Sequence, residues 1–178
     1  MVYKFRVILD AEEDVFRDIA ILEDDTLEDF HNAIVNSFGF DGLEIASFYT
    51  CDDQWNQEDE ISLFDTGDVV GEQKIMSDYK LSDILDAENT KIIYVYDFIN
   101  MWTFLVELAA IEDSVPGTLY PENLFSHGEM PLEAPEKDFS DSGSTDFDYD
   151  EDDYDEDELD MLDGGDSYED YGFEENWN

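Results

Sequence analysis

The sequence predicts an α+β fold over residues 1–137, followed by a disordered acidic tail over residues 138–178. Three observations lead to this prediction. Apolar and polar residues alternate near the start of the chain, which is the period of a half-buried strand. A later segment spaces its apolar residues as an amphipathic helix does. The tail contains 19 acidic residues and neither Lys nor Arg, and like charges at this density oppose collapse.

The first two strands are expected to pair as a hairpin. Residues 3–9 read YKFRVIL, in which every second side chain is apolar from Tyr3 onward. Residues 10–14 are polar and suit a turn, and residues 15–22 (VFRDIAIL) return as the second strand.

The main helix is expected over residues 27–38. Thr26 is a suitable N-cap, and Asp29 follows three residues later, which is close to a capping box with Asp in place of Glu. Apolar residues recur at helical spacing through this segment. Gly39 supplies the C-terminal stop.

Further strands are expected at residues 45–51, 91–98 and 102–110, with residues 99–101 turning a second hairpin between the last two. A short helix is expected at residues 81–85. Three other segments are not assigned to a helix or a strand. These are the acidic loop at residues 52–60, the glycine-containing stretch at 64–74, and the proline-rich stretch at 113–137, which is expected to be extended or to wrap the domain.

Charge excludes several functions. The net charge is −44, from 51 Asp and Glu against 7 Lys and Arg, and residues 1–137 hold 32 of the acids and all 7 basic residues, a net of −25. Binding to nucleic-acid phosphates needs a footprint of Lys and Arg, which is missing, and anionic membranes are disfavoured for the same reason. A basic protein partner fits this field better, while solubility alone is the simpler explanation.

The compartment expected is the cytoplasm. Cys51 is the single cysteine, so an internal disulfide is impossible. The start of the chain has acid where a signal peptide requires an apolar run, and no segment approaches the ~18 apolar residues of a membrane span.

Three segments occur in an order that resembles the plasmid open-reading-frame-three-like family, first named from the Ri plasmid. They are residues 26–40 (TLEDFHNAIVNSFGF), 45–55 (IASFYTCDDQW) and 94–108 (YVYDFINMWTFLVEL). Members are also known as passenger proteins of insertion elements, of the TnpR type. The resemblance covers about residues 3–136 and implies a ubiquitin-like roll built from a hairpin, a helix and further strands. It implies no established activity.

The motifs of the resemblance are short and partly altered. His31 stands in the family's Leu-His pair, and residues 96–98 with Trp102 stand in its Tyr-Asp-Phe-Gly-Asp-x-Trp motif. The Gly-Asp of that motif is Ile99-Asn100 here, and the family's closing Cys–Gly–Gly segment is absent. If these polar groups form a site in relatives, much of that site is missing from this chain.

The candidate pocket consists of His31, Tyr96, Asp97 and Trp102. Asp97 is the best single acid for catalysis because aromatic residues surround it in the sequence. The alternative is that its side chain caps the turn at residues 99–100. His31 and Cys51 are a possible Cys–His nucleophile pair, but a boundary histidine and a small buried thiol explain the same residues. His127 has no evident partner.

No metal or other cofactor is expected. Two His and one Cys are too few and too dispersed for a transition-metal site. Asp146, Asp148 and Asp150 match the first, third and fifth positions of an EF-hand loop, but Glu151 replaces its glycine and Asp157 its final glutamate.

The function expected is that of a non-enzymatic binding module that engages a protein partner, possibly basic, through its acidic surface or its tail. The tail's aromatic residues are available as contacts for that partner. Two alternatives remain open. One is an acidic mimic of nucleic acid that occupies a DNA-binding protein, and the other is a hydrolase-like site around Asp97, His31 and Trp102.

Overall fold

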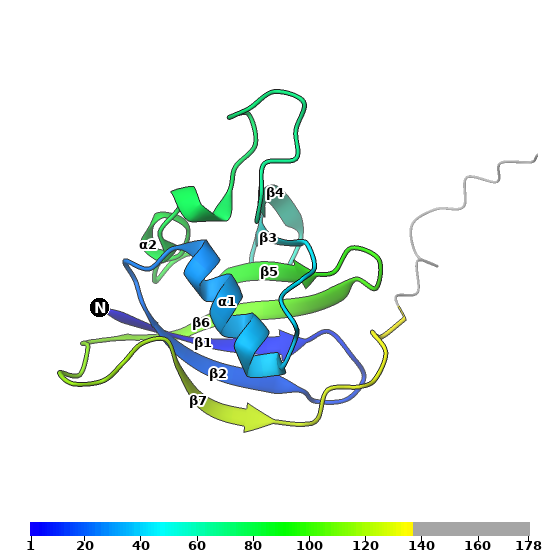
Figure 1. Cartoon of the computed structure of the whole chain (residues 1–178). Coiled ribbons are helices and arrows are strands. Elements are labelled where there is room, and N and C mark those ends of the chain that lie inside the picture. Colours follow the sequence, from blue (N-terminus) through cyan, green and yellow to red (C-terminus); the bar gives the residue numbers. More distant parts are fainter. Residues whose placement is uncertain (137–178) are drawn as a thin grey trace, which may run out of the picture. The chain divides into compact units, whose positions relative to one another are not determined.

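One antiparallel sheet of seven strands forms the body of the protein, and a helix lies across one of its faces (Figure 1). The computed structural model describes residues 1–136, which belong to one compact unit, Met1–Lys137. The elements in chain order are β1 (Val2–Leu9), β2 (Phe16–Leu22), α1 (Leu27–Phe38), β3 (Ala46–Cys51), β4 (Gln57–Ser62), the 3₁₀ turn η1 (Met76–Asp78), α2 (Leu81–Ile84), β5 (Lys91–Tyr96), β6 (Trp102–Glu112) and β7 (Glu122–His127). The strand order across the sheet is β4-β3-β5-β6-β1-β2-β7.

The two predicted hairpins are confirmed. β1 pairs with β2 from Val2 opposite Leu22 to Ile8 opposite Phe16, and β5 pairs with β6 through the turn at residues 97–101. β1 also pairs with β6, which joins the two hairpins into one sheet. The coarse prediction of an α+β fold is therefore confirmed, whereas the finer prediction of a ubiquitin-like roll stays a prediction.

Local sequence sets both ends of α1, as predicted. The Thr26 hydroxyl accepts a hydrogen bond from the Asp29 amide, and the Asp29 carboxylate accepts one from the Thr26 amide, which completes the capping box. Gly39 ends the helix with φ of 74°, and its N–H donates to the carbonyl of Val35. The N-cap side chain of Thr26 is expected to stabilise the helix by about 1 kcal/mol.

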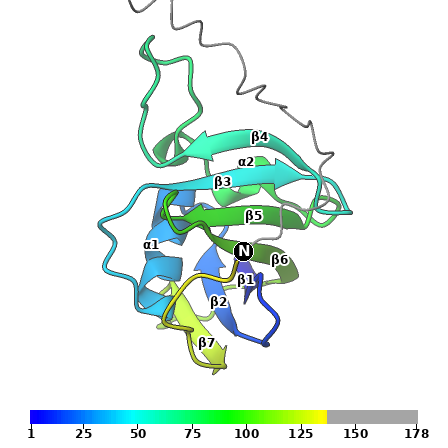
Figure 2. The same ribbon diagram turned by 90° about the vertical axis from the view of Figure 1, so that its right-hand side faces the viewer.

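Aromatic side chains hold α1 on the sheet. Figure 2 shows the helix beside the strands. Phe30 of α1 packs between Phe5 of β1 and Phe48 of β3, with ring centroids 4.4 and 5.7 Å away. All three side chains are buried. Burying a phenylalanine contributes roughly 1.5–3 kcal/mol, so this stack joins the centre of the helix to both halves of the sheet.

Arg17 joins the C-terminal end of α1 to the sheet. Its guanidinium donates to the carbonyl oxygens of Phe16, Ser37 and His127 and lies 4.9 Å from the centroid of the Phe38 ring. The last turn of a helix leaves carbonyl groups without intrahelical partners, and α1 has no basic residue of its own there. Arg17 on β2 supplies the missing donor.

Two edge strands lie in segments for which the sequence predicts no strand. The prediction of an acidic loop at residues 52–60 is wrong for residues 57–60, because β4 pairs there with β3. In the proline-rich stretch, predicted as extended, β7 pairs with β2. Both strands expose most of their side chains, so backbone pairing rather than an apolar pattern makes them strands.

The predicted tail, residues 138–178, lies outside the described residues, and its disorder stays a prediction. In the part of the chain that the structure describes, no helix has the length and apolar character that a membrane span requires.

Candidate functional site

His31 forms a buried hydrogen bond inside the domain. Its Nδ1 lies 2.7 Å from the hydroxyl of Tyr94 on β5, and its side chain is only 3% exposed. Burial lowers the pKa of His31 to about 4 and raises the pKa of Tyr94 well above its usual value. The imidazole is thus neutral at physiological pH and is held between the helix and the sheet.

Tyr96 and Trp102 pack around a residue that the sequence did not single out. Phe40, just after α1, stacks on Tyr96 with centroids 4.3 Å apart and meets Trp102 edge-on at 5.6 Å. The Tyr96 hydroxyl donates to the Asp41 carboxylate at 2.9 Å and accepts from the Gly42 amide at 3.1 Å. These contacts fix the loop after α1 to the end of β5.

Asp97 holds the turn between β5 and β6. Its Oδ1 accepts from the amides of Ile99 and Asn100, and its Oδ2 accepts from the Asn100 side chain at 2.6 Å. The backbone of Asp97 has φ of 62°, a left-handed conformation in which Asp and Asn are enriched. The side chain therefore caps the turn, which is the alternative weighed against a catalytic role.

The four residues of the candidate pocket are all packed into the interior. His31, Tyr96, Asp97 and Trp102 expose between 3% and 9% of their surface. Tyr96 lies two residues from Tyr94 on the same face of β5, and it pairs across the hairpin with Trp102. Within residues 1–136 no hydrogen bond joins His31 to Asp97, because each binds a different partner.

The remaining catalytic and metal candidates stay apart. His31 binds Tyr94 rather than Cys51, and burial, the largest cause, with the nearby carboxylates raises the pKa of the Cys51 thiol to about 11, which disfavours the reactive thiolate. His127 stacks on Phe16 at 5.1 Å. Residues 1–136 contain no group of three or more side chains placed to hold a metal ion, and the EF-hand-like run at residues 146–157 lies outside the described residues.

Sequence reasoning missed Tyr94, Phe40 and Asp41. Tyr94 could have been identified from the sequence. It lies two residues before Tyr96 on the same predicted strand, and a buried tyrosine hydroxyl requires a hydrogen-bond partner. Within the described residues, no buried side-chain nitrogen or oxygen lacks a hydrogen-bond partner. The polar groups of the interior satisfy one another.

The fold and this interior define a small α+β domain in which the buried polar side chains of the described residues are all hydrogen-bonded. The chain belongs to the plasmid pRiA4b ORF-3-like protein family, which it matches over residues 1–176. It is also similar to a solved structure, the protein of unknown function MM3350 from Methanosarcina mazei Go1. The identity is 26% and the TM-score 0.62, with 70% of this chain and 68% of that chain covered. The curated proteins include no match to the chain.

Proposed function

We propose that this protein is a non-enzymatic binding module whose acidic surface engages a basic protein partner. The observation that carries the proposal is the use of every described basic side chain within the chain itself. Most acidic side chains of the described residues form no ion pair and are left to act on other molecules.

The six basic residues of the described part have internal partners. Lys4, Arg6, Lys74 and Lys80 form ion pairs with Glu112, Asp18, Asp59 and Asp24. Lys91 donates to the carbonyl of Asp53 and lies over the Trp55 ring, and Arg17 binds three carbonyl oxygens. With the ion pair of Glu23 to the N-terminus, five of the 32 acidic residues in this part are paired, and the other 27 form no ion pair there.

The hydrogen bonds of the candidate pocket support the non-enzymatic part of the proposal. General acids and bases have to reach a substrate proton, whereas both carboxylate oxygens of Asp97 accept bonds from the turn and His31 binds Tyr94.

A cytoplasmic location and a ubiquitin-like roll belong to the same proposal. The lone thiol of Cys51 supports the first, and the hairpin followed by α1 supports the second.

The unpaired surface charge also favours a second candidate, an acidic mimic of nucleic acid. Such a mimic competes with DNA for a basic cleft, and its binding falls steeply with salt. Competition with duplex DNA for a DNA-binding partner distinguishes it from a module that binds basic segments elsewhere on a partner.

Anisotropy of a labelled peptide of alternating Lys and Ser tests the proposed function. The full chain is expected to bind it at low salt, and Kd is expected to rise at least about tenfold between roughly 20 and 300 mM NaCl, because salt screens exposed charges. A peptide of alternating Glu and Ser is the matched control and is expected not to bind. Absence of binding to the Lys peptide at low salt contradicts the proposal.

A further inference from the structure

We propose that an apolar patch at one end of the sheet docks a Lys- and Arg-rich amphipathic segment of another protein. The patch consists of Leu43, Ile45, Phe98 and Ile99, and we name it the turn-end patch. This inference rests on the proposed function and adds the place of contact and the chemistry of the partner.

Two loops that are far apart in sequence form the turn-end patch. The loop between α1 and β3 carries Leu43 and Ile45, and the turn between β5 and β6 carries Phe98 and Ile99 (Figure 1). The Asp97 amide donates to the carbonyl of Ile45 at 2.9 Å, which joins the two segments. Leu43 and Ile99 are 83% and 89% exposed, and Ile45 and Phe98 are also exposed.

The turn that presents the patch has a fixed conformation. Asp97 and Met101 have φ of 62° and 58°. Asp tolerates this conformation, whereas Met adopts it only when its surroundings impose it. The Asp97 carboxylate binds two amides of the turn, and the Met101 amide donates to the Asp97 carbonyl at 2.6 Å. A surface that is rigid before binding loses less conformational entropy when a partner docks.

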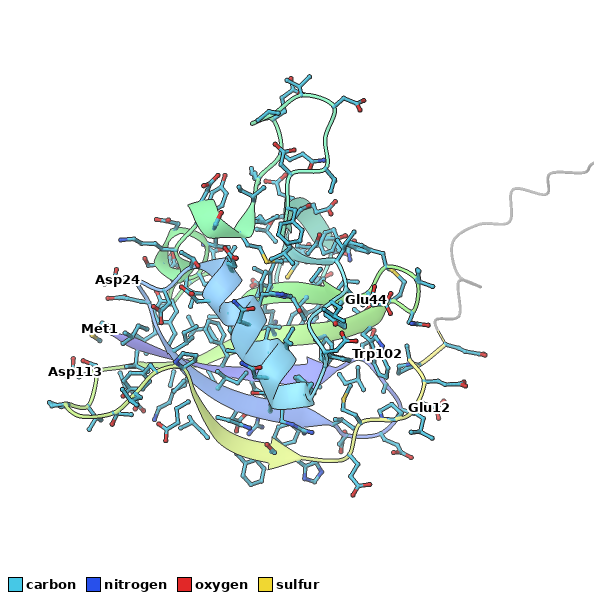
Figure 3. All side chains as sticks on the ribbon, viewed as in Figure 1. Met1, Glu12, Asp24, Glu44, Trp102 and Asp113 are labelled. Carbon is cyan, nitrogen blue, oxygen red and sulfur yellow. The ribbon has the colours of Figure 1, made fainter. Side chains whose placement is uncertain are left out.

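Acidic residues border the turn-end patch. Asp41 and Glu44 flank Leu43 and are exposed, and the Asp10 amide donates to the carbonyl of Thr103 beside the same turn. Figure 3 shows Glu12, Glu44 and Trp102 at the same end of the domain. The Leu43 amide, and then the Tyr96 hydroxyl, lower the pKa of Asp41 and keep it ionised.

The segments at this end contain no positive charge. Residues 9–15, 40–46 and 97–103 include neither Lys nor Arg. A partner that covers aliphatic side chains within this acidic border has to combine apolar and basic groups. Residues 138–178 carry a charge of −19, so electrostatic repulsion disfavours them as the occupant.

The test compares two peptides on the full chain. One peptide forms an amphipathic helix with a leucine face and a lysine face. The other peptide has serine in place of each leucine and the same charge. The variant Leu43→Ser/Ile99→Ser removes the two most exposed side chains of the patch. Its matched control is Val70→Ser/Leu119→Ser, because Val70 and Leu119 are 92% and 89% exposed on other loops.

We expect the full chain to bind the leucine peptide more tightly than the serine peptide. Leu43→Ser/Ile99→Ser should weaken binding of the leucine peptide about tenfold and leave the serine peptide unchanged, and the control variant should alter neither. Equal affinity for both peptides, or equal losses in both variants, overturns the turn-end patch while the proposed function stands. If neither peptide binds, the proposed function fails as well.

Discussion

The burial of His31 makes the fold sensitive to acid, because burial disfavours the charged imidazolium. The pKa of His31 is about 4 in the folded protein and near 6.5 in an unfolded chain. The stability that the neutral imidazole contributes is therefore complete above pH 6.5 and is lost as the pH falls toward 4.

The variant His31→Gln isolates this effect because glutamine does not titrate. Between pH 7.5 and pH 5, the unfolding free energy of the natural protein should fall by about 2 kcal/mol more than that of the variant. Urea denaturation at both pH values measures the difference. Parallel losses in the two proteins would contradict a buried neutral histidine.

Asp97 is expected to stabilise the turn through its hydrogen bonds and its tolerance of positive φ. Asp97→Ala should lower the unfolding free energy by about 1–2 kcal/mol, because it removes the acceptor and strains the backbone. Asp97→Asn keeps an acceptor and tolerates the same conformation, so its loss should be clearly smaller. Thermal denaturation ranks the two variants, and a reversed order would rule out the capping role.

At the scale of elements, substituting either of two arginines on adjacent strands is expected to lower the unfolding free energy by different amounts. Arg17 is buried and binds three carbonyl oxygens from β2, α1 and β7. Arg6 forms an exposed ion pair with Asp18. Arg17→Met should cost about 2–4 kcal/mol, since hydrogen bonds to charged groups contribute about 1.5–3 kcal/mol each.

Arg6→Met is the control, and its expected cost is below about 1 kcal/mol, because exposed ion pairs contribute little. Denaturant titration of both variants at one pH measures the contrast. Similar costs would mean that Arg17 does not join α1 to the sheet.

The elements also explain how much of the fold sequence predicts. The bounds of α1 were predictable because Thr26 and Asp29 cap its first turn and Gly39 ends its last turn. Each signal lies within one turn of the helix end that it sets. β4 was not predictable, since Ile61 is the one fully buried side chain on that strand and pairing with β3 decides its conformation. β7 lacks any buried side chain, so its pattern resembles that of a loop.

The candidate site was predictable only in part, for a similar reason. Residues 96–102 stood out as an aromatic motif, and the turn and its Asp97 cap follow from local chemistry. The partner of His31 is 63 residues away, and local sequence does not determine which strand faces a helix. The same limit applies to Phe40, whose contact with Trp102 depends on the loop after α1.

At the scale of the whole molecule, the net charge of −44 opposes compaction. Salt screens this repulsion, with a Debye length of about 10 Å at 0.1 M. The urea midpoint of the full chain should therefore rise when NaCl increases from about 0.01 to 0.2 M. A midpoint that falls with salt would mean that attractive ion pairs outweigh the repulsion.

At the same scale, we propose that acidic residues left unpaired by the fold engage a basic partner. Titration of the isotopically labelled full chain with the leucine–lysine peptide, followed by amide chemical shifts, tests this claim most directly. We predict shifts concentrated at residues 40–46 and 97–101 that disappear at high salt. Shifts confined to other surfaces would contradict the turn-end patch, and an absence of shifts at low salt would contradict the binding function itself.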